Sequence, residues 1–153
     1  MTASSTPSAA PAVSARVHHT GIVVSNIDAQ KTWYQGVFGM KEESRHRPNR
    51  KIRTVLLATD AGLRIELVEC LGSHRFQRYE NPRAAAASQG YHHWAVEVDD
   101  AAAAFDALVR AGAGIGTPPS AGPHGSAFAY VLDPEGNPIE LVQPSPGSAA
   151  TSQ

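Results

Sequence analysis

Two histidine pairs and two glutamates stand at matching places in the two halves of this 153-residue chain. One pair is at 18–19 and the other at 92–93, while Glu66 and Glu140 lie inside matching Ile-Glu-Leu-Val segments. The histidine pair and the glutamate of the first half each recur 74 residues later. In both halves the glutamate follows the second histidine of the pair by 47 residues. Two matched segments with one shared offset indicate a duplicated module.

The recurring residue types suit a divalent metal ion. A carboxylate that stands between Ile and Leu on a strand, as Glu66 and Glu140 do, is costly to desolvate unless it is paired or bound to metal. Successive strand residues point to opposite faces, so only one histidine of each pair can face a shared pocket. If the modules face each other, two imidazoles and two carboxylates converge on one ion per site. That set suits Ni²⁺, Co²⁺, Zn²⁺, Mn²⁺ or Fe²⁺, with room for water or substrate.

Each half repeats one order of elements. A β-branched run is followed by an acidic turn that can cap a helix, and three short strands follow the helix. The predicted helices cover 29–38 and 101–111. The clearest predicted strands are 18–24, 54–58 and 63–69 in the first half and 92–98, 127–132 and 138–143 in the second. The sequence therefore predicts βαβββ twice, an α+β fold with mainly antiparallel sheets.

The amino-acid composition of the two ends of the chain indicates where the folded domain begins and ends. The ends at 1–15 and 144–153 are rich in Ser, Thr, Ala and Pro, which predicts flexible tails. The folded domain is then 16–143, made of modules at about 16–72 and 90–143 with a connector at 73–89. The N-terminal segment also lacks the charged start and apolar core of a signal peptide, so we expect a soluble, cytoplasmic protein.

Overall composition excludes several classes of function. The net charge of −1 gives no general basic field for nucleic acid. No apolar run reaches the roughly 18 residues of a membrane helix, so we expect no membrane span. The single cysteine, Cys70, excludes an internal disulfide framework and a cysteine-cluster zinc site.

The chain resembles the vicinal oxygen chelate superfamily in three segments, HHTGIVVSNIDAQKTWYQGVFGM, HHWAVEVDD and DPEGNPIELVQ. That superfamily includes glyoxalase I, methylmalonyl-CoA epimerase, extradiol dioxygenases, and fosfomycin and bleomycin resistance proteins. Its ligand histidine stands two residues before Gly or Ala, which maps the ligands to His19 and His93, with Glu66 and Glu140 as the carboxylates. The first histidine of each pair is then expected to point away, toward helix or dimer contacts. The resemblance also implies a U-shaped open sheet around the metal, and a homodimer.

The resemblance implies chelation of a small-molecule substrate through vicinal oxygens, with the metal as a Lewis acid. The ligand order His, Glu, His, Glu resembles that of bacterial metal-dependent glyoxalase I. It favours an isomerase, epimerase or lyase in which Glu140 or Glu66 moves a proton α to a carbonyl. One alternative is an Fe²⁺ extradiol-type dioxygenase acting on a catechol-like aromatic, which needs two histidines and one carboxylate. Another is a metal-free protein that binds an antibiotic or a small metabolite.

Three further residues are candidates for substrate contact. Glu97 shares the strand parity of His93, so we expect it on the same face. Tyr130, on the penultimate strand, can contact substrate as well. Arg53 ends a basic run at 41–53, where a guanidinium can hold an anionic group, although such a run is also typical of a solvated loop.

Overall fold

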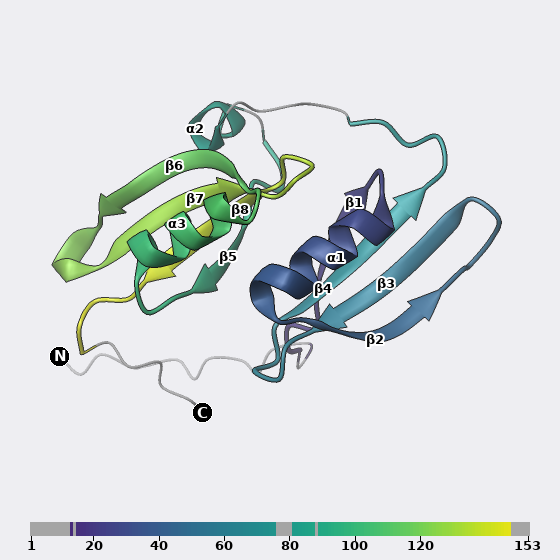
Figure 1. The fold of residues 1–153 in the computed structure, drawn as a ribbon, viewed down its shortest axis with the longest axis horizontal. Helices are drawn as coiled ribbons and strands as arrows, with labels where there is room; N and C mark the ends of the chain where they lie inside the picture. Colours follow the sequence, from purple (N-terminus) through teal and green to yellow (C-terminus); the bar gives the residue numbers. More distant parts are fainter. Residues whose placement is uncertain (1–12, 14, 76–80, 88, 148–153) are drawn as a thin grey trace, which may run out of the picture.

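The computed structural model describes residues 13, 15–75, 81–87 and 89–147 (Figure 1). The first half contains β1 (Thr20–Val24), α1 (Ile27–Phe38), β2 (Lys41–His46), β3 (Ile52–Ala58) and β4 (Arg64–Cys70). The second half contains β5 (Trp94–Glu97), α3 (Ala101–Arg110), β6 (Gly114–Ala121), the 3-10 turn η1 (Pro123–Gly125), β7 (Ala127–Leu132) and β8 (Pro138–Gln143). The predicted βαβββ order is confirmed in both halves.

The segments between and beyond the modules are described only in part. The connector carries one element that the sequence analysis did not predict, the short helix α2 (Pro82–Ala85). Most of both predicted tails lies outside the described residues. No helix among the described residues is long and apolar enough to cross a membrane.

The described strands form two four-stranded sheets of identical design. The strand orders are β1-β4-β3-β2 and β5-β8-β7-β6. In each sheet the first pair is parallel and the other two are antiparallel. The register repeats as well, because Gly21 lies opposite Glu66 and Ala95 opposite Glu140, each 74 residues later. The duplication seen in the sequence therefore extends to the pairing of individual strand residues.

The two long helices begin at equivalent caps. The side chain of Asn26 accepts a hydrogen bond from the Ala29 N–H, and that of Asp100 accepts one from Ala103. Such caps satisfy N–H groups that have no partner within the helix. Gly39 ends α1 at a φ of 63°, the left-handed conformation that glycine adopts without steric cost. Figure 1 shows α1 lying across β3 and β4, and α3 lying across β7 and β8.

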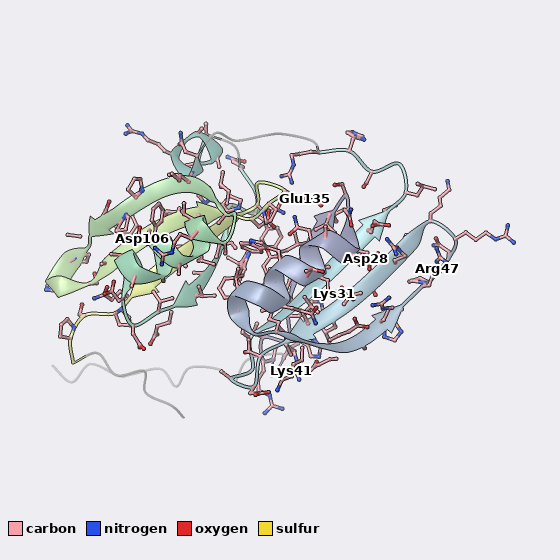
Figure 2. All side chains as sticks on the ribbon, in the orientation of Figure 1. Asp28, Lys31, Lys41, Arg47, Asp106 and Glu135 are labelled. Carbon is pink, nitrogen blue, oxygen red and sulfur yellow. The ribbon has the colours of Figure 1, made fainter. Side chains whose placement is uncertain are left out.

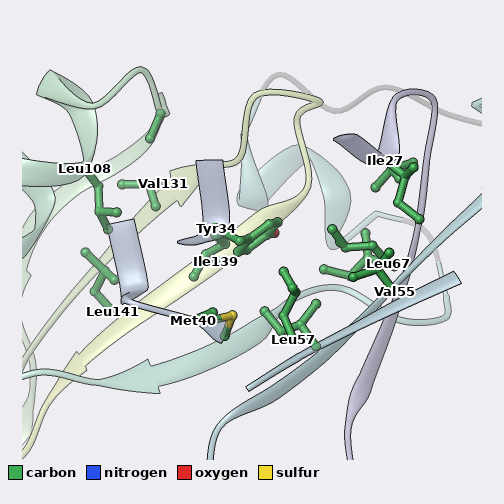
Figure 3. Packing of buried hydrophobic residues seen from close by; sticks show 14 of the residues in the cluster. Ile27, Tyr34, Met40, Val55, Leu57, Leu67, Leu108, Val131, Ile139 and Leu141 are labelled. Atoms are coloured by element: carbon green, nitrogen blue, oxygen red, sulfur yellow. The ribbon is translucent and has the colours of Figure 1, made fainter. Parts of the chain in front are cut away.

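One apolar core extends through both modules (Figure 3). Tyr34 of α1 lies between the buried side chains of the first sheet, such as Leu67, and those of the second, such as Ile139. Its hydroxyl donates a hydrogen bond of 2.9 Å to the buried carboxylate of Asp133. The indole N–H of Trp33 donates another to the backbone carbonyl at the end of α3. Helix α1 therefore joins the two modules.

The turn between β7 and β8 also contacts the first module. Glu135 accepts hydrogen bonds from the backbone N–H groups of Ser25 and Asn26, just before α1. Figure 2 labels Glu135 between the two modules. A carboxylate at a helix N-terminus is stabilised by the helix dipole and by the free N–H groups there. This turn thus fixes one module against the other.

Candidate metal centre

Strands β4 and β8 carry the two predicted glutamates on equivalent faces. The residues on either side of each glutamate are fully buried under the helices: Ile65, Leu67, Ile139 and Leu141. Because side chains alternate along a strand, Glu66 and Glu140 lie on the opposite, helix-free face of each sheet. This alternation keeps both carboxylates out of the apolar core.

Each predicted ligand histidine lies beside the glutamate of its own module. The distance from His19 Nε2 to Glu66 Oε2 is 3.5 Å, and that from His93 Nε2 to Glu140 Oε2 is 2.9 Å. The four side chains are between 21% and 34% exposed, so both pairs are accessible from solvent. The sequence predicts both histidines within strands, at 18–24 and 92–98. In the structure each stands one residue before its strand.

The two histidines also border one open pocket of about 500 Å³. It lies between the starts of β1 and β5, and Arg75 and the β7–β8 turn contribute to its wall. Glu66 and Glu140 are not part of that wall. Within the described ranges, no three His, Cys, Asp or Glu side chains are grouped to hold one ion. The four predicted ligands are therefore assembled as two pairs.

The first histidine of each pair contacts the second through its Nδ1 atom. The Nδ1 atoms of His18 and His19 are 2.7 Å apart, and those of His92 and His93 are also within hydrogen-bond distance. His92 Nε2 lies 2.6 Å from the carbonyl oxygen of Pro82 in α2. The expected helix contact is therefore present at His92. Both first histidines also contact their neighbours, because residues that precede a strand do not follow its alternation.

Tyr130 distinguishes the second pair from the first. It lies opposite Glu140 across β7 and β8, and its ring centre is 5.1 Å from that of His93. Burial, together with the hydrogen bond and charge of Glu140, raises the pKa of Tyr130 to about 12, so the phenol remains a donor near neutral pH. The matching position opposite Glu66 is Leu56, which has no donor.

The other two candidate residues lie in different surroundings. Glu97 is exposed at the end of β5. It lies two residues beyond Ala95, which is opposite Glu140, so Glu97 is on the face that carries Glu140. Arg53 donates hydrogen bonds to Glu69, at 2.8 Å, and to Asp28, at 3.2 Å. Glu69 lies three residues beyond Glu66 on β4, so Arg53 is on the helix-bearing face, away from the histidine–glutamate pairs.

The donor atoms of the two pairs fit a divalent ion of the borderline type. Each pair presents an imidazole Nε2 toward a carboxylate oxygen on an open face. Nitrogen and oxygen donors of this kind suit Ni²⁺, Co²⁺, Zn²⁺, Mn²⁺ and Fe²⁺. The residues present therefore fit the metal that the sequence analysis expects.

Comparison with known proteins relates the whole domain to one superfamily. The sequence model of the Glyoxalase/Bleomycin resistance protein/Dioxygenase superfamily matches residues 16–141. Lactoylglutathione lyase of Neisseria meningitidis serogroup A is 32% identical over 136 residues, covering 86% of this chain and 93% of the relative. The lactoylglutathione lyase of Haemophilus influenzae is 30% identical over 132 residues, covering 84% and 92%.

Solved structures share the fold. The glyoxylase/bleomycin resistance protein/dioxygenase domain from Frankia sp. EAN1pec superposes with a TM-score of 0.69 at 22% identity. The match covers 88% of this chain and 96% of that domain. At this identity the similarity establishes the architecture of paired βαβββ modules.

Proposed function

Because the chain belongs to the glyoxalase/bleomycin resistance protein/dioxygenase superfamily, we propose that it is a divalent-metal-dependent lyase or isomerase of the glyoxalase type. The observation that carries this proposal is the pairing of His19 with Glu66 and of His93 with Glu140, on equivalent faces of two duplicated modules. Three relatives of at least 30% identity are named lactoylglutathione lyase, which supports a lyase activity.

The proposed ligands are the Nε2 atoms of His19 and His93 and the carboxylates of Glu66 and Glu140. When bound, the ion supplies Lewis-acid polarisation of two vicinal substrate oxygens. The chain's own residues do the rest of the chemistry. One of the two glutamates accepts the proton α to the substrate carbonyl and returns it to the former carbonyl carbon, as a general base and then a general acid. The hydroxyl proton passes to the other vicinal oxygen, which completes the isomerisation.

The two glutamates differ in how firmly they are held. Glu140 lies 2.9 Å from His93 and faces the phenol of Tyr130, whereas Glu66 lies 3.5 Å from His19 and faces Leu56. Glu140 therefore has a phenol donor beside its carboxylate and Glu66 has none. Tyr130 and the exposed Glu97 border the same face and are the proposed contacts for substrate.

We propose that a second copy of the chain completes each site. The two pairs lie on separate sheets, and neither gathers a third metal-ligating side chain among the residues described. In a symmetric dimer, the His19–Glu66 pair of one copy can face the partner's second pair, which gives two identical four-ligand sites.

Two measurements test the function. The first is metal per chain in untagged protein purified without oxygen and without added metal. The second follows formation of lactoylglutathione from glutathione and the corresponding 2-oxoaldehyde, with each of the five candidate ions.

About one equivalent of Ni, Co, Zn or Mn per site, with turnover, is expected. Iron with oxygen uptake on a catechol panel would instead support the dioxygenase. A chain that takes up no metal would support a binding protein.

A further inference from the structure

A continuous series of polar contacts leads from α2 to the second histidine–glutamate pair. The carbonyl oxygen of Pro82 contacts His92 Nε2, His92 Nδ1 contacts His93 Nδ1, and His93 Nε2 contacts Glu140. We propose that His92 is a positioning residue that fixes the ring orientation and tautomer of His93. This inference rests on the proposed metal site and deepens it.

The direction of each hydrogen bond follows from the backbone acceptor. A carbonyl oxygen only accepts, so the proton on His92 is on Nε2. A neutral imidazole has one donor and one acceptor nitrogen, so His92 Nδ1 is the acceptor. The neighbouring Nδ1 of His93 must then donate. His93 Nε2 is therefore left without a proton, which is the form that binds a metal ion.

The same assignment explains what His93 faces. The distance from His93 Nε2 to a carboxylate oxygen of Glu140 is 2.9 Å. In the neutral tautomer assigned above, both atoms are acceptors. Two acceptors at this distance are stabilised when a cation is shared between them. The hydrogen bond from His93 Nδ1 to His92 thus leaves His93 Nε2 free to bind a divalent ion.

The first module offers a weaker version of the arrangement. His18 contacts His19 through the Nδ1 atoms, at 2.7 Å. In the described part of the chain, His18 makes no other hydrogen bond, and it is exposed, whereas His92 is half-buried. Without a backbone acceptor on its Nε2, His18 does not fix which nitrogen of His19 carries the proton. The two residues therefore form a natural matched pair for experiment.

The test compares His92→Phe, His92→Asn and His18→Phe in the full chain. Dissociation constants for Ni²⁺ and Zn²⁺ are measured by competition with a chromophoric chelator. Loss of an outer partner of a metal-binding histidine weakens binding about 10–100-fold, which is the expected result for H92F. H92N should recover most of the affinity, because its Oδ1 can accept the His93 N–H. H18F should change affinity much less than H92F.

A second readout uses the metal-free protein, so that it does not depend on a loaded site. Long-range ¹⁵N–¹H spectra above pH 8 report which ring nitrogen of His93 carries the proton. The wild type should show the proton on Nδ1, and H92F should show a mixture, while circular dichroism confirms that H92F is folded. Metal affinity of H92F equal to that of the wild type, or an unchanged His93 tautomer in H92F, would overturn the positioning role. Absence of metal binding by the wild type would instead overturn the proposed function.

Discussion

Glu69 and Gln143 occupy the same place in the two modules, and each accepts a hydrogen bond from the first N–H of a helix. Glu69 Oε2 lies 2.9 Å from the Ile27 N–H of α1, and Gln143 Oε1 lies 3.0 Å from the Ala101 N–H of α3. The last strand of each module therefore holds the start of that module's helix. Only Glu69 is charged, and it also pairs with Arg53.

Replacing Glu69 by Gln gives the first module the neutral acceptor of the second. The backbone hydrogen bond from Ile27, followed by that from Arg53, holds the pKa of Glu69 below its usual value of 4.5. A lowered pKa contributes stability above about pH 4.5 that is lost as the pH falls. We expect E69Q to lower the free energy of unfolding by about 1 kcal/mol at pH 7. Urea denaturation of the wild type and E69Q between pH 7 and pH 3 measures this difference in the free energy of unfolding.

The difference between wild type and E69Q should shrink below pH 4.5, because protonated Glu69 no longer differs in charge from Gln. The matched control is E97Q, since Glu97 is exposed at the end of β5. It should leave the unfolding free energy unchanged. A gap between wild type and E69Q that stays constant down to pH 3 would rule out this pKa assignment.

The hydrogen bond between Ile27 and Glu69 also bears on how well the sequence predicts where the first helix begins. The sequence predicts a start of the first helix at residue 29, whereas α1 begins at Ile27. Local capping residues such as Asn26 can be recognised from the sequence. The acceptor for the Ile27 N–H comes from Glu69, 42 residues away, and no local pattern reveals it. A distant side chain thus holds the start of α1. The start of α3 has an equivalent contact with Gln143, but there the prediction of residue 101 is confirmed.

The bounds of strand β2 could not be predicted from the sequence either. Its sequence, Lys-Glu-Glu-Ser-Arg-His, has no alternation of apolar and polar residues, and the basic run beginning there was interpreted as a solvated loop. It forms an edge strand that pairs with β3 on one side. Hydrogen bonding to a neighbour, and not burial of side chains, holds such a strand, so hydrophobic periodicity cannot predict it.

The buried link between the modules gives a second stability prediction. Replacing Tyr34 by Phe removes the hydroxyl that donates to the buried Asp133 carboxylate. Hydrogen bonds to charged groups stabilise proteins by about 1.5–3 kcal/mol, so we expect Y34F to lose about 2 kcal/mol in urea denaturation. Asp133 keeps its bond from Asn137, which prevents a larger loss. Y91F, at a fully exposed tyrosine, is the control, and equal stability of both variants would contradict the link.

Tyr130 reports on the charge of Glu140. The pKa of Tyr130 is raised to about 12, first by burial and then by Glu140. Replacing Glu140 by Gln removes a negative charge that opposes ionisation, so the pKa of Tyr130 should fall toward 10. Ultraviolet titration of tyrosinate in the metal-free protein measures this shift. E66Q is the control, because Glu66 faces Leu56, and an equal shift in E66Q would refute the pairing.

Metal binding should stabilise the folded chain. A ligand that binds only the folded state at 100 times its dissociation constant adds about 2.7 kcal/mol to the free energy of unfolding. We expect this gain for the wild type with its preferred ion, reversal by a chelator, and loss of the gain in His93→Ala. His124→Ala is the control, since His124 lies in the η1 turn. An H93A protein that still gained the full stabilisation would remove His93 from the ligand set.

The proposed dimer predicts recovery of activity from two inactive variants. E66Q damages the first half of the site and E140Q the second. If each site joins the first half of one copy to the second half of its partner, a mixed dimer has one doubly damaged site and one intact site. Unfolding and refolding an equal mixture should then restore about one quarter of wild-type turnover. Mixing H93A with E140Q, both in the second half, leaves no intact site and should restore nothing. If the first mixture is as inactive as the second, the site lies within one chain.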